Sequence, residues 1–187
     1  VEKKAGEPIK VKYILDLREF PGTPIEKLVI HDVKTIVDDP EIGIVVETMG
    51  GITPAYEFVK SCLLAGKHVV TSNKALVAAH GTELIRIAAE KNVSFLFEAS
   101  VGGGIPIIRP LVECLGGEEI EEISGILNGT TNYILTKMNE EGWSFEEALK
   151  CAQELGYAER NPEADVEGYD TCRKIAILTA VATGKEV

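Results

Sequence analysis

The sequence predicts an α/β chain, in which strands and helices alternate to build a parallel sheet, followed by a second region of mixed α+β structure. Three observations predict this class. Short apolar runs alternate with helical stretches in the first half, the links between them are only a few residues long, and helices dominate after residue 97. Strands joined through helices by short links pair in parallel with right-handed crossovers. The elements expected in the first half are strands 42–48, 67–71 and 93–97 and helices 54–65 and 74–91.

Composition and charge limit the kind of protein. The 187 residues are 45% apolar, enough to bury a sizeable core. A formal net charge of −11, without a cluster of basic and aromatic residues, argues against a nucleic-acid partner. No apolar run reaches the length of a membrane span and the first residues do not read as a signal peptide, so we expect a cytoplasmic protein that makes no contact with a membrane. The scattered Cys62, Cys114, Cys151 and Cys172 fit reduced packing residues better than a zinc site or a disulfide framework.

The first predicted element is a strand over residues 10–17. Residues 18–42 contain a turn at 20–24 and a stop at 38–40, and the pattern predicts no further helix or strand there. No strand, glycine-rich loop and helix precede the first strand, and the chain begins with Val1. We therefore expect the chain to be a piece of a longer protein.

Helix boundaries in the first half follow from capping residues. Pro54 is expected at the first helical position of helix 54–65, and Gly66 is expected to end it. The pair Ser72 and Asn73 is expected to cap helix 74–91.

Three loops are expected at the carboxyl ends of the parallel strands, where ligands of such sheets bind. The first, 47–51, contains two adjacent glycines that allow a backbone to approach a ligand, although a plain strand-to-helix turn explains them equally. In the second, Lys74 lies in the first turn of a helix, where the helix dipole disfavours a cation, so an anionic or reacting partner is one explanation. The third, 98–106, has a carboxylate and three glycines, which suit a cation, an anion or a flexible hinge.

The second half is predicted to begin with helix 106–115 and a strand over 119–127, where apolar and polar residues alternate. The polar run 128–133 then opens helix 130–141, and its free N–H groups would suit a carboxylate as well as a plain N-cap. Helix 144–155 follows, with Ser144 and Glu147 predicted to form a capping box.

The segment 156–174 concentrates polar chemistry. Acidic side chains precede Gly168, and Asp170 and Lys174 then stand four residues apart on one face of a predicted helix. An ammonium group beside a carboxylate in a partly enclosed cleft can exchange a proton with a substrate oxygen. The alternative is an ordinary solvated surface pair, which is common on helices.

These motifs together resemble homoserine dehydrogenases. The resemblance is carried by ASVGGGIPIIRPL (99–111), NGTTNYIL (128–135) and GYAERNPEADVEGYDTCRKIAIL (156–178), supported by TSNKALVA (71–78). It implies an NAD(P)-dependent oxidoreductase that interconverts L-homoserine and L-aspartate 4-semialdehyde in threonine and methionine biosynthesis. It further implies a partial Rossmann-type nucleotide-binding domain over residues 1–97 and a substrate-binding, catalytic and dimerisation domain over 98–187.

The resemblance also implies roles for individual residues. Lys174 would be the acid/base, with Asp170 beside it, and Lys74 would lie between nicotinamide and substrate. The substrate ammonium is expected to contact Glu159 and Asp165, and the rest of the substrate Gly129, Thr130 and Tyr157. The cofactor, NAD or NADP, is expected to contact Thr48, Gly50, Gly51 and Lys74. A monovalent cation, sodium, is expected to be bound by Glu98 with the carbonyls of Val101, Gly103 and Ile105. A homodimer is expected, with strand 119–127 in a sheet that pairs across it.

Several alternatives remain open at this point. The family's glycine-rich dinucleotide fingerprint is expected before Val1, and its last helix and strand after Val187. A related amino-acid dehydrogenase on the same scaffold and a catalytically inactive dimerisation fragment are both rival interpretations. The choice between NAD and NADP is also open, since Asp16 could meet a free ribose and Arg18 a 2′-phosphate.

Overall fold

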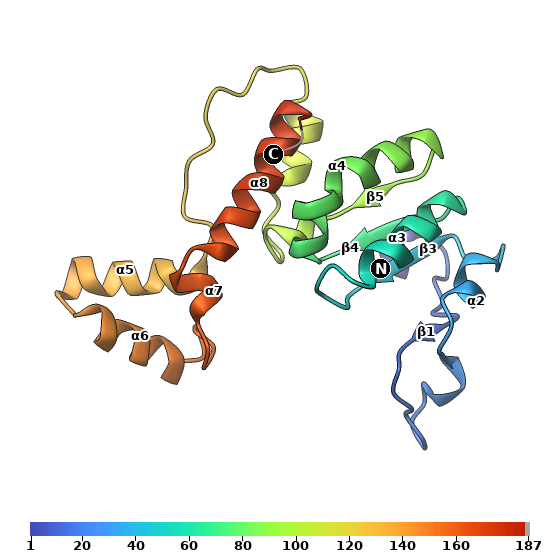
Figure 1. Cartoon of the computed structure of the whole chain (residues 1–187), viewed down its shortest axis with the longest axis horizontal. Helices are drawn as coiled ribbons and strands as arrows, with labels where there is room; N and C mark the ends of the chain where they lie inside the picture. The colour runs from blue at the N-terminus through green and yellow to red at the C-terminus, as the bar shows by residue number, and fades with distance from the viewer. Residues whose placement is uncertain (186–187) are drawn as a thin grey trace.

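A computed structural model describes residues 1–185 of the chain. The molecule is elongated, with a parallel sheet and its helices at one end, a helical hairpin at the other, and the long helix α8 between them (Figure 1). The strands are β1 (Ile14–Leu15), β2 (Val29–Ile30), β3 (Ile44–Glu47), β4 (His68–Thr71) and β5 (Phe95–Leu96). The helices are α1 (Glu2–Ala5), α2 (Lys34–Val37), α3 (Ala55–Leu64), α4 (Lys74–Glu90), α5 (Gly129–Glu141), α6 (Phe145–Glu154), α7 (Glu163–Val166) and α8 (Tyr169–Thr183), with short helical turns η1 (Glu26–Leu28), η2 (Glu98–Ser100) and η3 (Pro110–Cys114).

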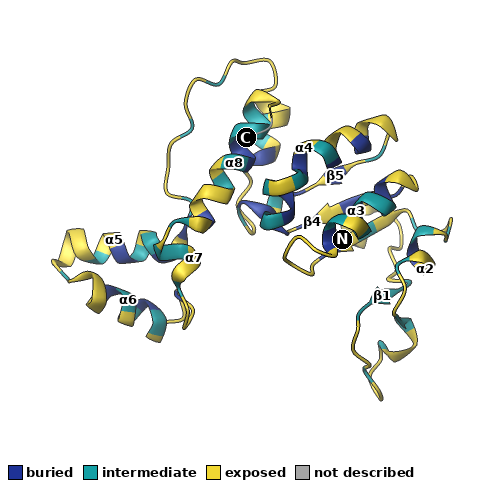
Figure 2. Cartoon of the chain, in the orientation of Figure 1, coloured by how far each residue is buried: buried dark blue, intermediate teal, exposed yellow. Residues whose placement is uncertain are grey.

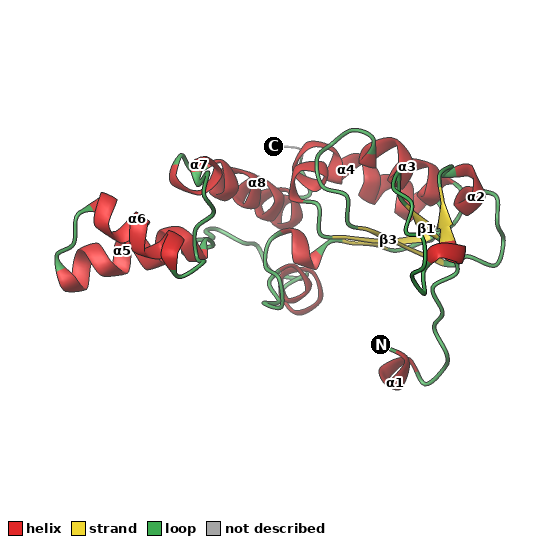
Figure 3. Cartoon of the chain, turned by 90° about the horizontal axis from the view of Figure 1, so that it is seen from below, coloured by secondary structure: helices red, strands yellow, loops and turns green. Residues whose placement is uncertain are grey.

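The predicted strands 42–48, 67–71 and 93–97 form one parallel sheet in the order β3-β4-β5. Val45 lies opposite Val69, and Val69 lies opposite Phe95, so these three side chains share one face. The helices α3 and α4 cover that face (Figure 3), and Val69 and Phe95 are buried there. The α/β prediction for this region is confirmed.

The other face of this sheet is open to solvent. Its side chains come from the alternate positions of the same strands, Ile44, Val46, Val70 and Leu96, and all four are exposed (Figure 2). The strands are apolar on both faces because parallel strands normally carry helices on each side.

The helices of this region begin and end at the predicted capping residues, except that α3 begins one residue later than predicted. Asn73 is the N-cap of α4, and its side chain accepts a hydrogen bond from the Leu76 N–H at 3.1 Å. Gly66 follows α3 with φ 77°, a conformation that favours glycine. Pro54 lies one residue before the first helical residue of α3 rather than in it, because its φ and ψ of −90° and 7° are not helical.

The N-terminal region has a shorter first strand than predicted, and it contains short helices and a strand after it that were not predicted. Only β1 forms within the predicted strand 10–17, because the one strand that pairs with it, β2, is itself two residues long. The turn η1, strand β2 and helix α2 lie within residues 18–42, where the sequence pattern predicted no element. Each is four residues or shorter, too short for a periodic pattern to be recognised.

The predicted strand 119–127 is wrong. No strand is assigned to these residues, which run as part of a long loop between η3 and α5 (Figure 1). The alternation of polar and apolar residues was real, but a strand also requires a neighbouring backbone to pair with, and this segment pairs with none in residues 1–185. Helix 106–115 is also shorter than predicted, since its helical residues are 108–114 and end in the π-helical turn η3.

The helical hairpin of α5 and α6 has a small core of its own, built from Ile134, Ala148, Ala152 and Ala158. The predicted capping box starts α6. The Ser144 Oγ accepts from the Glu147 N–H at 3.2 Å, and the Glu147 carboxylate accepts from the Ser144 N–H at 2.9 Å.

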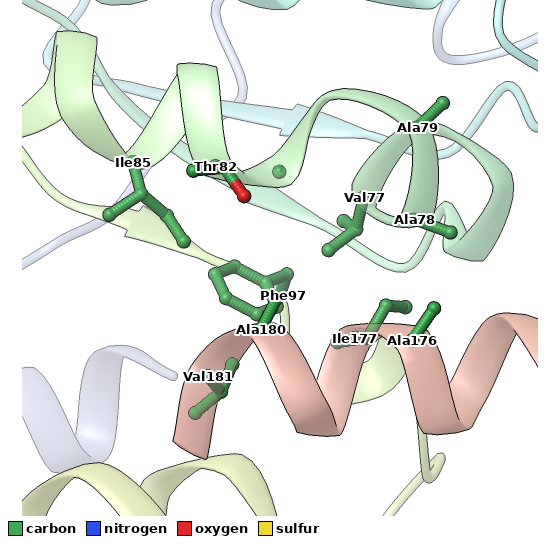
Figure 4. Close-up of a pocket in the computed structure, with 11 residues that line it drawn as sticks. Val77, Ala78, Ala79, Thr82, Ile85, Phe97, Ala176, Ile177, Ala180 and Val181 are labelled. Atoms are coloured by element: carbon green, nitrogen blue, oxygen red, sulfur yellow. The ribbon is translucent and has the colours of Figure 1, made fainter. Parts of the chain in front are cut away.

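The long helix α8 packs against α4 and so joins the two ends of the molecule. Figure 4 shows the contact, with Val77 and Thr82 of α4 facing Ile177 and Ala180 of α8 beside the ring of Phe97. Small side chains leave a cavity of about 40 Å³ between these helices. None of the described helices is both long and apolar enough to cross a membrane.

Candidate active site

The candidate site begins at the first turn of α8. Gly168 has φ 79° and precedes the helix, which then places Asp170 and Lys174 one turn apart. Asp170 is 8% exposed, and its Oδ2 lies 2.8 Å from the Lys174 Nζ. The predicted pair therefore forms, and burial separates it from an ordinary surface ion pair.

The first turn of α4 supplies the second lysine. Lys74 is the first residue of α4, directly after the N-cap Asn73, and its Nζ forms an ion pair with the Oδ1 of Asp170. The two partners are 96 positions apart in the sequence. Both helices present their first turns to the same point, so one buried carboxylate holds two ammonium groups. This contact explains the cation at a helix N-terminus, where the dipole alone would disfavour it.

The electrostatics of the cluster favour proton exchange. Burial, together with the positive charges of Lys174 and Arg173, lowers the pKa of Lys74 and outweighs the opposing effect of Asp165. Burial likewise lowers the pKa of Lys174, against the opposing effect of Asp165. An amine with a lowered pKa is a better acid/base near neutral pH than an ordinary lysine.

Two groups at the end of the long loop complete the cluster. The backbone carbonyl of Leu127 accepts a hydrogen bond from the Lys174 Nζ. The Asn128 side-chain amide donates to the Asp165 Oδ1 at 2.7 Å and to the Asp170 Oδ2 at 3.0 Å. Asn128 was not among the predicted site residues, because an N-cap explains it from the sequence. Its position at the head of a dense polar run was the signal that could have assigned it to the site.

The predicted substrate contacts are only partly brought together. Asp165 joins the cluster through Asn128. The Thr130 hydroxyl donates to the Tyr157 carbonyl at 2.6 Å, and Gly129 is the first residue of α5 beside them. Glu159 is exposed, and within residues 1–185 its carboxylate makes no hydrogen bond or ion pair with the cluster.

The loop after β3 is hydrogen-bonded to Glu47 at the end of that strand and to Asn73 at the start of α4. This buried carboxylate accepts from the Met49 N–H at 2.6 Å, the Gly50 N–H at 3.3 Å and the Thr71 hydroxyl. The Asn73 amide donates to the Gly51 carbonyl at 2.6 Å. The loop and the start of α4 are therefore one hydrogen-bonded unit. Glu47 was not among the predicted site residues, although an acidic residue at the end of an apolar strand is itself a signal.

The carboxylate of Glu98, in the glycine-rich loop after β5, binds backbone N–H groups of the chain itself. Both oxygens of Glu98 are engaged, Oε1 by the N–H groups of Ile107 and Ile108 at 2.5 and 2.8 Å, and Oε2 by that of Arg109 at 2.8 Å. Burial raises the pKa of this carboxyl, but the three backbone donors together hold it below its ordinary value. The described residues contain no group of three or more His, Cys, Asp or Glu side chains placed to hold a metal ion.

Two family comparisons match the two parts of this chain. A sequence model described as "Homoserine dehydrogenase, NAD binding domain" matches residues 5–98, and one described as "Homoserine dehydrogenase" matches residues 106–187. The homoserine dehydrogenase of Synechocystis is 53% identical over 156 residues, which make up 83% of this chain and 36% of that protein. The chain thus spans little more than a third of the length of this relative.

Solved structures show the same relationship. A homoserine dehydrogenase from Thiobacillus denitrificans is 50% identical with a TM-score of 0.76, over 83% of this chain and 36% of that one. A hyperthermophilic archaeal homoserine dehydrogenase in complex with NADPH is 31% identical with a TM-score of 0.79, over 99% of this chain and 54% of that one. Sequence and fold agree along nearly the whole length, and the chain belongs to the homoserine dehydrogenase family, with a Rossmann-like NAD-binding part followed by a catalytic part.

Proposed function

We propose that the protein that carries this chain is an NAD(P)-dependent oxidoreductase that interconverts L-homoserine and L-aspartate 4-semialdehyde, a step in threonine and methionine biosynthesis. One observation carries the proposal. Lys74 and Lys174 come from distant parts of the sequence and meet on the buried carboxylate of Asp170. Such a cluster has no evident purpose in folding, because buried charges are costly and two lysines on one carboxylate are more so.

The proposed chemistry follows from the protonation of Lys174. In the oxidation direction its neutral Nζ accepts the proton of the substrate hydroxyl, and in the reverse direction its ammonium donates a proton to the aldehyde oxygen. Its lowered pKa makes the neutral form accessible. Asp170 and the Leu127 carbonyl orient the Nζ by accepting its hydrogen bonds. The nicotinamide cofactor, when bound, supplies or removes the hydride.

The loop after β3 suits a nucleotide cofactor. Gly50 and Gly51 have φ values of 77° and 71°, and a Cβ added at either would have no atom within 4 Å. The loop therefore presents bare backbone at the carboxyl end of a parallel strand, where cofactors of such sheets bind. We propose that Thr48, Gly50, Gly51 and Lys74 contact NAD or NADP here. The archaeal relative solved in complex with NADPH supports a nicotinamide nucleotide as the ligand.

The choice between NAD and NADP rests on residues after β1. The Arg18 guanidinium binds the Asp16 carboxylate with its Nε at 3.0 Å and its Nη2 at 2.8 Å, and it holds the pKa of that carboxyl well below its usual range. The free 2′-hydroxyl of an NAD ribose would hydrogen-bond to Asp16, and the 2′-phosphate of NADP would bind Arg18. Either ligand must compete with this ion pair.

The substrate is proposed to lie between α5, α7 and α8. Its ammonium group would be held by Asp165, with Glu159 closing over it, and its carboxylate by the start of α5 at Gly129 and Thr130. Tyr157 is 58% exposed, and its ring lies tilted by 40° to that of Tyr133 with 5.1 Å between the ring centroids, so much of its surface is available to a ligand.

A monovalent cation site at Glu98 with the carbonyls of Val101, Gly103 and Ile105 remains part of the proposal. The three N–H groups that Glu98 accepts leave it acceptor capacity, because an ionised carboxylate offers about four lone-pair directions. Glu98 would share its oxygens between sodium and the N–H groups before η3.

Domain division, oligomeric state and location complete the proposal. We propose a boundary at residues 97 and 98, supported by the two family matches, which end at 98 and begin at 106. A homodimer is proposed through the extended segment 119–127, whose backbone has no strand partner in the described part of the chain. A cytoplasmic location fits the four free cysteines, which suit a reducing compartment.

The direct test follows the absorbance of reduced nicotinamide with the full-length protein, L-homoserine and either NAD or NADP. We expect the band to grow with homoserine and with no other hydroxy-amino acid, and the favoured cofactor then distinguishes the Asp16 and Arg18 alternatives. Repeating the assay in choline chloride instead of sodium chloride tests the cation, and sedimentation of the same preparation tests the dimer. A folded protein that reacts with another hydroxy-amino acid, or with none, would leave the related dehydrogenase or the inactive fragment as the explanation.

Replacing Glu47 with Ala is expected to raise the KM for the cofactor about tenfold or more, while the KM for homoserine changes little. The variant frees the Met49 and Gly50 N–H groups, which shape the cofactor loop, and it leaves the buried Thr71 hydroxyl without its acceptor, at a cost of about 1–3 kcal/mol. The matched control is Glu57→Ala, an exposed glutamate on the adjacent α3. Equal cofactor KM values for the two variants would contradict a positioning function for Glu47.

A further inference from the structure

We infer that Asn128 is a positioning residue for the proposed reaction, and that its side-chain amide holds the substrate-binding carboxylate of Asp165 and the lysine-binding carboxylate of Asp170 in fixed places. This inference rests on the proposed function. Neither the family resemblance nor the residue roles proposed above assign a function to this side chain. Its contacts are those of a residue that organises the site rather than one that reacts.

Asn128 uses every polar atom of its side chain, and it does so toward three different helices. Its Nδ2 donates to Asp165 of α7 at 2.7 Å and to Asp170 of α8 at 3.0 Å. Its Oδ1 accepts from the Thr131 N–H at 2.8 Å and from the Thr131 hydroxyl at 3.0 Å, which caps α5. The residue is 8% exposed, so water does not replace these bonds easily.

A neutral donor is required at this point by the charges that surround it. The groups that face Asn128 are Asp165 of α7, Asp170 and Lys174 of α8 and, through Asp170, Lys74 of α4, with Arg173 contributing positive charge nearby. Two carboxylates that meet without a donor between them repel each other, and one of them tends to take up a proton. An amide group offers one hydrogen to each carboxylate without adding charge.

The arrangement divides the carboxylates between two tasks. Both lysines occupy Asp170, one at each oxygen, so Asp170 has little capacity left for a substrate. Asp165 accepts from Asn128 through Oδ1, and within residues 1–185 its Oδ2 has no hydrogen-bond partner. That oxygen is the one available to a substrate ammonium group, and Asn128 keeps it from turning toward the lysines.

Two substitutions separate positioning from capping. Asn128→Ser and Asn128→Asp both retain a good N-cap acceptor for α5, since Ser, Asp and Asn rank close together at this position. Both remove the amide donor, and the Asp variant adds a third carboxylate beside Asp165 and Asp170. The control is Ser144→Ala, which removes the N-cap of α6 in the neighbouring helix and leaves the site untouched.

In the full-length protein we expect Asn128→Ser to raise the KM for homoserine and lower kcat, each by about tenfold, because a hydrogen bond to a charged group is lost. The KM for the cofactor is expected to stay within about twofold. Asn128→Asp is expected to lose more activity at pH 8 than Asn128→Ser. Its activity relative to the parent at the same pH is expected to rise as the pH falls, because a proton in the carboxylate cluster restores a donor. Ser144→Ala is expected to lower the melting temperature without changing kcat or the KM values. Kinetic constants of both Asn128 variants within twofold of the parent would overturn the inference.

A measurement independent of activity distinguishes failure of this inference from failure of the proposed function. The carboxyl introduced at position 128 would lie beside the carboxylates of Asp165 and Asp170, which raises its folded-state pKa. The stability of Asn128→Asp is then retained at low pH and is lost as pH rises through that value. We therefore expect the melting temperature of Asn128→Asp, relative to Asn128→Ser, to fall between pH 4 and pH 8. Parallel pH profiles for the two variants would refute the inference even if the parent oxidises homoserine, and diverging profiles would support it even if another substrate is used.

Discussion

Replacing Lys174 with Met is expected to lower kcat for homoserine oxidation by about 10²- to 10⁴-fold, the usual contribution of a general acid or base. Met keeps the length and much of the volume of the side chain but cannot carry the proton. Cofactor affinity, measured by quenching of protein fluorescence or by calorimetry, should be unchanged, because Lys174 lies on α8 and the proposed cofactor loop follows β3.

The pH dependence of kcat should also change in the variant, in a direction that the role of Lys174 fixes. Oxidation requires the neutral amine of Lys174 as proton acceptor, so kcat should rise with pH through the pKa of Lys174. Burial lowers that pKa from the ordinary 10.5, and the midpoint of the rise should therefore lie below 10.5. The same rise should be absent from Lys174→Met.

The control for this experiment is Lys150→Met, an exposed lysine on α6. It should match the parent in kcat and in pH profile. If Lys174→Met kept more than a tenth of the parent kcat, Lys174 would not be the acid/base, and Lys74 would become the residue to test next.

Elements with strong periodicity or strong caps were predictable from the sequence. The strands β3 and β4 and the helices α3, α4 and α6 lie where apolar spacing and capping residues placed them. Strand 119–127 failed for a different reason, because alternation records which face of a segment is apolar but not whether another strand lies beside it. Pairing between strands depends on the rest of the molecule, and no local pattern contains it.

In the site, too, contacts between residues near in sequence were predictable, and contacts between residues far apart in sequence were not. The spacing of Asp170 and Lys174 is local, and the pair forms as the helical period predicts. The ion pair of Lys74 with Asp170 spans 96 positions, and only the resemblance to a family joined those residues in advance. Asn128 was missed as a site residue because a helix cap explained it fully from the sequence, and its second set of contacts depends on α7 and α8.

The packing of α8 on α4 sets the distance between the two lysines, so a change far from the reacting groups should also reach them. Ile177 is 2% exposed and lines the small cavity between the helices (Figure 4). Replacing it with Ala should lower the free energy of unfolding by about 2–5 kcal/mol, measured by urea denaturation, because buried volume is lost beside a gap that already exists.

The matched control lies two residues away on the same helix. Ile175 is 40% exposed, and Ile175→Ala removes the same atoms from a side chain that is partly in water. Its cost in unfolding free energy should be below about 1 kcal/mol, since a surface substitution leaves no cavity. Equal losses for the two variants would mean that the contact between α4 and α8 contributes little to stability.

The activity of the same two variants tests whether this contact also holds the site together. Lys74 comes from α4 and Asp170 from α8, so helices that shift to close the enlarged cavity must move one against the other. Because a misplacement of about 1 Å can cost on the order of a hundredfold in rate, kcat of Ile177→Ala should fall well below that of Ile175→Ala even at temperatures where both are folded. An unchanged kcat in folded Ile177→Ala would show that the ion pair on Asp170, and not the apolar contact behind it, fixes the two lysines.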